Sequence, residues 1–116
     1  MLRSWNNPNL DIQRKVNTQK DLFFVGELAS KIIATAMFGY EGHRGWLNYL
    51  AVLPQFRKRG FGKRLLQFGE TKLIERDCPK LNLQIRTDNK EAINFYKALG
   101  YTEDEAISFG KRLIED

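Results

Sequence analysis

The sequence predicts a mixed α/β (α+β) domain whose single sheet has both antiparallel and parallel strands. Three segments rich in β-branched and aromatic residues come first, at residues 22–28, 32–40 and 46–53. The hydrophobic period then becomes helical over residues 60–76. A further strand-like segment and a further helical segment follow. Because strands alternate with helices in so short a chain, we expect one domain over residues 1–116.

The first part of the chain predicts an antiparallel hairpin. Residues 29–31 separate the first two strand segments and are few enough for a tight turn. Residues 41–45 are polar and contain glycine, which is typical of a loop before the third strand. Pro54 stops that third strand because proline has no N–H for a strand ladder. Before the hairpin, we interpret residues 11–16 as a short amphipathic helix.

The last third of the chain predicts a strand followed by a helix. Residues 81–87 alternate between apolar and polar, as a strand does. Asp88, followed three residues later by Glu91, resembles a capping box at the start of a helix. Gly100 is expected to end that helix, because glycine readily adopts the left-handed conformation. The candidates for last strands are residues 101–102 and 107–113.

Composition and charge exclude several classes of protein. The formal net charge is +5, and the single cysteine, Cys78, leaves no internal disulfide and no zinc-like cluster. No apolar run reaches the roughly 20 residues of a membrane span, and residues 1–8 lack the apolar stretch of a signal peptide. We therefore expect a cytoplasmic protein with no metal and no membrane. Nucleic acid is disfavoured as a partner, since the basic charge is not paired with stacking aromatics.

The densest basic segment, residues 57–64, lies between the third strand and the first long helix. A helix N-terminus attracts anions through its unpaired N–H groups and partial positive charge. Gly60 and Gly62 allow the backbone to approach phosphate oxygens without a Cβ in the way. The order of strand, glycine turn and helix therefore predicts a site for a compact phosphate ligand. The alternative is a tight strand-to-helix turn whose basic face is simply solvated. The apolar face of the helix behind the turn is Phe61, Leu65, Phe68, Gly69 and Leu73.

Two motifs together resemble the signature of the GNAT superfamily of N-acyltransferases. The first is residues 50–62 (Leu-Ala-Val-Leu-Pro-x-x-Arg-x-x-Gly-x-Gly), and the second is residues 89–101 (Asn-Lys-Glu-Ala-Ile-Asn-Phe-Tyr-Lys-Ala-Leu-Gly-Tyr). Residues 5–8, 39–45 and 110–116 further resemble the YpeA-like branch of bacterial acetyltransferases. The resemblance implies a GNAT-like acyl-CoA N-acyltransferase fold, with acetyl-CoA as cosubstrate and an amine as acceptor.

The resemblance also implies roles for individual residues. The strand before the glycine turn would pair with the pantetheine arm of acetyl-CoA, and the turn would bind the pyrophosphate. Asn89 matches a position near that arm, and Tyr96 matches the tyrosine that serves as general acid beside the thioester sulfur. Without the resemblance, Tyr96 would be interpreted as a core residue of its helix. The implied cofactor-binding residues are Leu50, Ala51, Val52, Arg57, Lys58, Arg59, Gly60, Phe61, Gly62, Lys63 and Asn89, and the implied catalytic residue is Tyr96.

The general base is left open by the sequence. A lysine-like amine has a pKa of about 10.4, so it has to lose a proton before it attacks a thioester. Some members of the family that acetylate protein N-termini carry a glutamate twelve residues before the tyrosine, where this chain has Gln84. An amide cannot accept that proton. The remaining candidates are Glu27, Glu41, His43 and, through a water molecule, Tyr49.

The start of the chain departs from the family pattern. GNAT domains usually open with a strand and a helix before the segment that resembles residues 5–17, and this chain lacks both. We therefore expect an N-terminally shortened fold, or Met1 as an internal start. The strand at residues 22–28 would then lie at the sheet edge, which predicts a homodimer. The leading function is N-acetyl transfer from acetyl-CoA to an amine by direct attack, and the alternative is a non-catalytic acyl-CoA-binding or interaction module.

Overall fold

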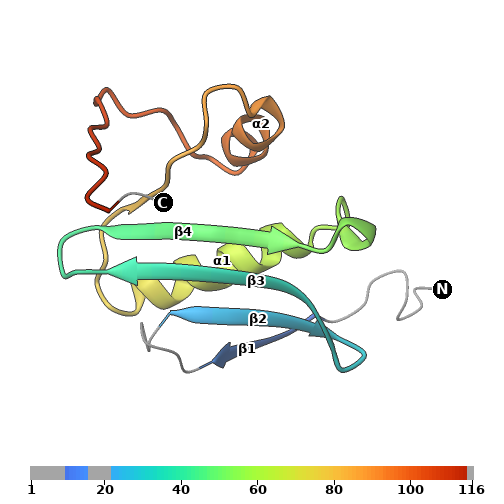
Figure 1. The fold of residues 1–116 in the computed structure, drawn as a ribbon. Helices are drawn as coiled ribbons and strands as arrows, with labels where there is room; N and C mark the ends of the chain where they lie inside the picture. Colours follow the sequence, from blue (N-terminus) through green and yellow to red (C-terminus); the bar gives the residue numbers. More distant parts are fainter. Residues whose placement is uncertain (1–9, 16–21, 115–116) are drawn as a thin grey trace. The chain divides into compact units, whose positions relative to one another are not determined.

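The computed structural model describes residues 10–15 and 22–114, which fall into two compact units (Figure 1). The first unit extends to Gln84, and the second begins at Ile85. The first unit contains a five-stranded sheet and a long helix, α1 (Phe61–Ile74). Its strands are β1 (Asp11–Lys15), β2 (Phe23–Leu28), β3 (Lys31–Tyr40), β4 (Gly45–Val52) and β5 (Leu81–Asn82). The expectation of a single domain stays a prediction.

The sheet is antiparallel from β1 to β4 and parallel between β4 and β5. The predicted mixed sheet is therefore confirmed. The hairpin turn is made by Ala29 and Ser30, whose φ angles of 52° and 67° are those of a two-residue primed turn. This turn matches the natural twist of the flanking strands, so β2 and β3 pair from Leu28 and Lys31 onward.

The first described strand is a correction to the sequence prediction. Residues 11–16 were expected to form a helix, but Asp11–Lys15 form β1, and Val16 lies outside the described residues. So short a segment gains little from helix formation because nucleation is costly, whereas pairing with β2 satisfies its backbone groups. β1 therefore occupies the edge of the sheet, and the expected edge position of residues 22–28 is wrong. The homodimer stays a prediction.

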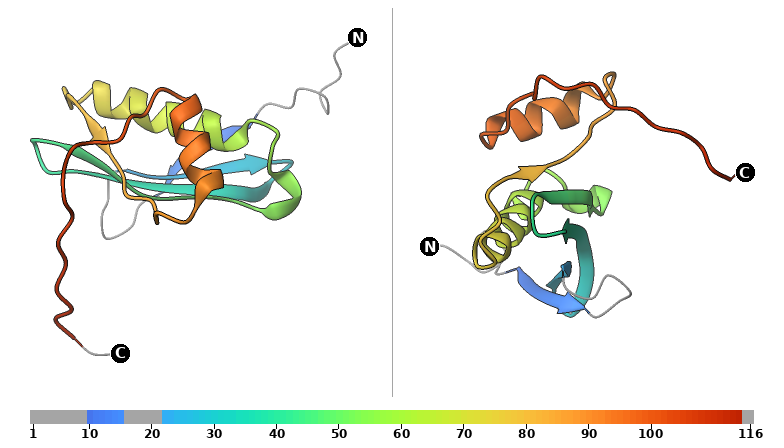
Figure 2. Two further views of the ribbon diagram at one scale, coloured as in Figure 1. Left: turned by 90° about the horizontal axis from the view of Figure 1, so that it is seen from above. Right: turned by 90° about the vertical axis from the view of Figure 1, so that its left-hand side faces the viewer.

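Helix α1 packs across one face of the sheet, against β2, β3 and β4 (Figure 1 and Figure 2). The closest approach is at Gly69, where an added Cβ would overlap the ring of Phe38 on β3. The Phe38 ring packs against Phe24, which in turn contacts Phe68 with ring centroids 5.1 Å apart. Each fully buried side chain of this kind contributes roughly 1.5–3 kcal/mol. The largest buried side chains are Phe24, Ile33, Phe38, Phe61, Leu65 and Leu66.

Helix α2 (Lys90–Ala98) belongs to the second unit. Its N-cap is Asn89, whose Oδ1 accepts a hydrogen bond from the backbone N–H of Ala92 at 3.1 Å. The predicted cap at Asp88 is therefore wrong by one residue. Gly100, with a φ of 96°, follows the helix in the left-handed conformation, as predicted.

Three predicted strands of this region are absent or short. The strand expected at residues 81–87 is limited to β5, and residues 101–102 and 107–113 form no strand. A strand needs a partner for its backbone groups and a core for its apolar face. Among the described residues, none pairs with these segments as a strand, and the side chains of Ile107 and Phe109 are 84% and 92% exposed.

We expect Gly69→Ala to destabilise the first unit by about 2–3 kcal/mol, because the new methyl group would overlap the buried Phe38 ring. Gly39→Ala is the matched control, since its Cβ would meet only Asn48 Nδ2, at an ordinary 3.8 Å. Urea denaturation of the two variants beside the wild type measures the difference. Equal midpoints for the two variants would contradict this account of the helix packing.

Candidate functional site

A short turn connects the end of β4 to the start of α1. After β4 the chain makes one 3₁₀ turn, η1 (Pro54–Phe56), and then residues 57–60 lead into the helix. The Nε of Arg57 donates a hydrogen bond to the carbonyl oxygen of Val52 at 3.1 Å. This bond ties the turn to the last residue of β4. The α1 N-terminus is therefore held beside the end of that strand.

The N-terminus of α1 has the geometry of an anion site. Gly60 is the N-cap with a φ of 83°, and no side chain caps the helix. A Cβ at Gly60 would meet nothing within 4 Å, so the backbone is open on that side. Lys58 also has a positive φ, of 63°. N–H groups of the first helical turn, which have no intrahelical acceptor, are therefore available to an anion from outside.

The side chains of the turn divide between exposed charged groups and the core. The Phe61 side chain is only 2% exposed, so this residue can serve a ligand only through its N–H group. The Arg59 guanidinium lies over the ring of Phe56, 5.4 Å from its centroid. Lys58 and Lys63 are exposed. A positive surface thus surrounds the helix N-terminus, which favours a phosphate ligand.

The edge of β4 that faces β5 is mostly unpaired. The two strands pair only at Gly45 with Leu81 and at Trp46 with Asn82, and β5 then ends (Figure 1). Beyond these pairs, no strand in the described part of the first unit continues along β4 up to Val52. An open strand edge offers N–H and C=O groups to any extended ligand that carries amides.

A β-bulge lies in the middle of β4. Tyr49 is opposite Met37 and Leu47 is opposite Phe38, so Asn48 is the extra residue on β4. Bulges bend a strand and re-aim its side chains, and they are frequent beside active sites. The bulge was not predicted, because a register shift depends on the partner strand and leaves no mark in the hydrophobic pattern of one segment.

Two predicted site residues lie in the second unit, Tyr96 on α2 and Asn89 at the N-cap of that helix. Asn89 uses its Oδ1 to cap the helix. Tyr96 makes edge-on ring contacts with Phe95 and Tyr101, at centroid distances of 4.9 Å and 5.6 Å. Burial disfavours the phenolate and raises the pKa of Tyr96 above its ordinary value of 10.0. The phenol therefore stays protonated at neutral pH.

Three of the candidate general bases lie away from the open part of β4. Glu27 is on β2, two strands across the sheet, and accepts a hydrogen bond from Gln13 at 3.0 Å. Glu41 accepts one from the backbone N–H of Arg44 at 3.1 Å, and His43 belongs to the same loop. That loop precedes β4, so it is at the opposite end of the strand from the glycine turn. Tyr49 is the candidate that lies next to the unpaired edge.

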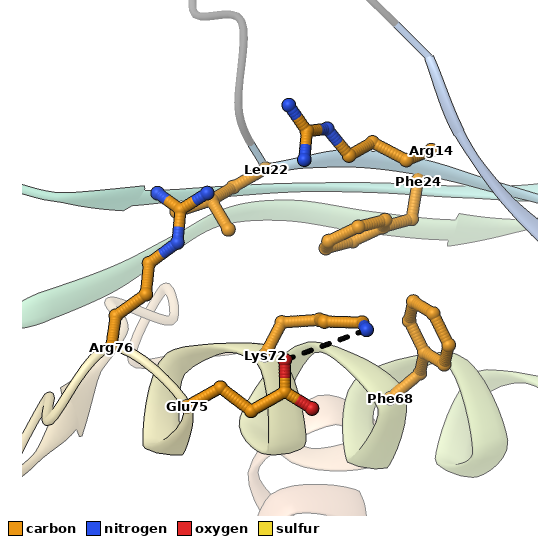
Figure 3. A pocket seen from close by; sticks show the side chains of 7 residues that line it. All are labelled: Arg14, Leu22, Phe24, Phe68, Lys72, Glu75 and Arg76. Atoms are coloured by element: carbon orange, nitrogen blue, oxygen red, sulfur yellow. Dashed lines mark ion pairs between the residues drawn. The ribbon is translucent and has the colours of Figure 1, made fainter.

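A cavity of about 250 Å³ opens elsewhere in the first unit, between β1, β2 and α1 (Figure 3). Lys72 and Glu75 form an ion pair at its mouth, with a 3.5 Å separation, and the Lys72 Nζ also lies 5.2 Å from the Phe68 ring centroid. None of the predicted site residues lines this cavity. Its lining residues are Arg14, Leu22, Phe24, Phe68, Lys72, Glu75 and Arg76.

Among residues 10–15 and 22–114, no helix combines the length and the apolar character that crossing a bilayer requires. Within the same residues, no group of three or more histidine, cysteine, aspartate or glutamate side chains is placed to hold a metal ion. Two features of the first unit that are open to a ligand are the uncapped N-terminus of α1 and the part of the β4 edge beyond β5.

In the first unit, an unpaired strand edge leads to an uncapped helix N-terminus. This arrangement is expected of an acyl-CoA-dependent N-acyltransferase, because the edge can pair with the amides of the pantetheine arm and the N-terminus can bind phosphate. Residues 2–101 match the Acetyltransferase (GNAT) family, and the chain belongs to this family. An acetyltransferase of Yersinia enterocolitica is 48% identical over 116 residues, which are 100% of this chain and 82% of that protein. An acetyltransferase of Pectobacterium atrosepticum has the same identity and coverage.

Solved structures have the same fold. An aminoglycoside N-acetyltransferase in complex with CoA superposes with a TM-score of 0.72 at 22% identity, over 83% of this chain and 80% of that one. The ribosomal-protein-S18-alanine N-acetyltransferase of Escherichia coli has a TM-score of 0.67 at 30% identity, over 72% of this chain and 54% of that one. The first likeness shows the fold alone, because identity is low.

These findings confirm the main expectations from the sequence. The chain has a GNAT-like fold and is an acyl-CoA-dependent N-acetyltransferase with acetyl-CoA as cosubstrate. The alternative of a non-catalytic module has no support among the relatives named above, which are acetyltransferases. The YpeA-like branch, the individual site residues and the acceptor stay predictions.

We expect the Tyr96 phenol to titrate above the ordinary tyrosine value, because burial disfavours its charged form. The folded state binds this proton more tightly than the unfolded state. The stability that this raised pKa contributes to the folded state is therefore complete below a pH of about 10. It is lost as the pH rises through the pKa of Tyr96 in the folded state. The difference in phenolate absorbance between the wild type and Tyr96→Phe isolates this group. A difference titration centred at the ordinary value would contradict the burial of the hydroxyl.

Proposed function

We propose that this protein transfers the acetyl group of acetyl-CoA to a primary amine, of a small molecule or a protein lysine, by direct attack. The observation that supports this proposal most is the unpaired edge of β4, which leads into the uncapped N-terminus of α1. Direct attack needs no covalent enzyme intermediate. The protein's task is then to position the thioester, to stabilise the oxyanion and to assist the leaving thiolate.

The backbone of the first unit supplies the cosubstrate site in this proposal. Leu50, Ala51 and Val52 pair with the amides of the pantetheine arm, as an added strand would. The N–H groups of residues 58–63 bind the pyrophosphate, and the neighbouring lysine and arginine side chains neutralise its charge. Asn89 remains a proposed contact of the arm through its Nδ2, since its Oδ1 caps α2.

The chemistry follows from the ordinary pKa values of the reacting groups. A backbone N–H of the β4 edge stabilises the oxyanion, as preorganised donors do in other acyl transfers. The CoA thiolate has a thiol-like pKa of about 8.5, below that of an ordinary tyrosine. Because the Tyr96 pKa is raised further, transfer of its proton is uphill. We therefore assign Tyr96 to donating a hydrogen bond to the thiolate.

The identity of the base is part of the proposal. Gln84 cannot take the amine proton, which weakens the case for N-terminal acetylation. Tyr49 lies beside the open part of β4 and can relay the proton through a water molecule. Among similar structures, one enzyme is named for an aminoglycoside and another for the alanine of a ribosomal protein, so both small and protein acceptors occur on this fold.

We expect Gly60→Val to abolish CoA binding, because its side chain would project from the turn where the phosphates bind. Gly42→Val is the matched control. Gly42 also has a positive φ, 95°, and open space around its Cβ, but it lies in the loop before β4. Both variants therefore bear the same kind of backbone strain. Calorimetric titration with CoA that finds wild-type affinity in Gly60→Val would place the ligand elsewhere.

We expect Tyr96→Phe to lower kcat by about 10²-fold, in the range found when one hydrogen-bond donor to a developing anion is removed. The change removes only the hydroxyl, so the ring contacts with Phe95 and Tyr101 should survive and CoA affinity should be unchanged. Release of free thiol from acetyl-CoA, with amine saturating, measures kcat. Tyr101→Phe is the control for loss of a nearby hydroxyl. An undiminished kcat in Tyr96→Phe would reduce Tyr96 to a packing residue.

A further inference from the structure

A row of apolar side chains crosses three strands of the sheet in register. Phe23 on β2 is opposite Met37 on β3, and Met37 is opposite Tyr49 on β4. The rings of Phe23 and Tyr49 reach each other over Met37, with centroids 6.5 Å apart and planes at 63°. All three side chains therefore project from the same face of the sheet. We call them the Phe23–Met37–Tyr49 row.

This row lies on the face of the sheet opposite α1. Side chains alternate along a strand, and the neighbours Phe24 and Phe38 are the ones that pack under the helix with Phe68. The row is only partly covered, and the side chain of Tyr49 is 42% exposed. In the described part of the first unit, no helix covers this face. A partly exposed apolar row of this kind offers a surface to an apolar ligand, and Tyr49 is its most exposed member.

The Phe23–Met37–Tyr49 row lies next to the position expected for the thioester of the cosubstrate. In the proposed function, the pantetheine arm runs from the glycine turn back along β4. Its amides pair there with Val52, Ala51 and Leu50, so its thioester end lies next to the residues that precede Leu50. These are Tyr49 and the bulged residue Asn48. An amine that attacks the thioester there has the Phe23–Met37–Tyr49 row beside it.

Among the described residues of the first unit, the charges around the row disfavour a polycation. None of the three side chains is acidic, and the charge at the end of β4 is basic, from Arg57, Lys58 and Arg59. The carboxylates of Asp11 and Glu27 lie toward the β1 edge of the sheet, where both accept hydrogen bonds from Gln13 Nε2 at 2.9 Å and 3.0 Å. A polyamine or an aminoglycoside needs carboxylates close to the reacting amine to offset its charge.

We propose that the acceptor is a primary amine with an aromatic or aliphatic substituent and no second positive charge, and that Tyr49 determines this specificity by contacting the substituent. The inference rests on the proposed function, because it places the thioester at the bulge of β4. The substituent packs on the Phe23–Met37–Tyr49 row while the amine faces the thioester. Tyr49 acts here through its ring, independently of any part that its hydroxyl takes in proton transfer.

The test compares 2-phenylethylamine with spermidine as acceptors, in the wild type and in Tyr49 variants. We expect the wild type to prefer 2-phenylethylamine in kcat/KM. Tyr49→Ala should raise the KM for this amine roughly five- to tenfold, the usual loss for an aromatic contact. Tyr49→Leu, which keeps an apolar surface, should lose less. Tyr49→Glu should reverse the preference toward spermidine, because it places a carboxylate beside the reacting amine.

The controls separate failure of this inference from failure of the proposed function. Calorimetric CoA binding should be the same in all Tyr49 variants and in the wild type, and circular dichroism should show every variant folded at the assay temperature. Ile74→Ala, at an exposed position at the end of α1, should leave every KM unchanged. A wild type that fails to bind CoA overturns the proposed function. A wild type that binds CoA but acetylates spermidine better, or does not acetylate 2-phenylethylamine, overturns the specificity inference, as does an unchanged KM in Tyr49→Ala.

Discussion

The close packing of α1 on β3 is the constraint on which the rest of the first unit depends. At Gly69 the helix backbone approaches the Phe38 ring so closely that no Cβ fits between them. This contact holds the helix against the sheet, while the chain between Val52 and Phe61 is short and tied back by Arg57. The first turn of α1 can therefore lie only at the end of β4. The position of the uncapped α1 N-terminus is a consequence of core packing.

The alternation of side chains along β2 assigns two neighbouring aromatics to different tasks. Phe24 is 1% exposed and packs under α1 with Phe38, so it stabilises the fold. Phe23 points to the other face and contacts Tyr49. Because one residue separates the two faces, a one-residue register slip of β2 would move Phe23 to the core face and Phe24 to the face that carries the Phe23–Met37–Tyr49 row. The tight turn at Ala29 and Ser30 keeps that register.

The departures from the sequence-based expectations have a common cause, which is that each outcome depends on a backbone partner that the local sequence pattern does not identify. The segment that forms β1 is so short that its own hydrophobic pattern does not distinguish a helix from a strand. Its pairing with β2 makes it a strand. Residues 107–113 are a candidate last strand from the sequence, yet no described strand pairs with them. At the start of α2, Asp88 and Asn89 are both good caps, and the side chain that reaches the N–H of Ala92 is that of Asn89.

By itself, the sequence determined the mixed sheet, the hairpin, the two helices and the family, because hydrophobic period, glycine position and motif order are local properties. It also placed Gly60 and the basic residues at a helix N-terminus. Only the tertiary structure decided the bulge at Asn48, the early end of β5, and which of two adjacent aromatics faces α1. Each of these depends on the register between strands that are distant in the chain, and register is set by the partner strand and the packed core.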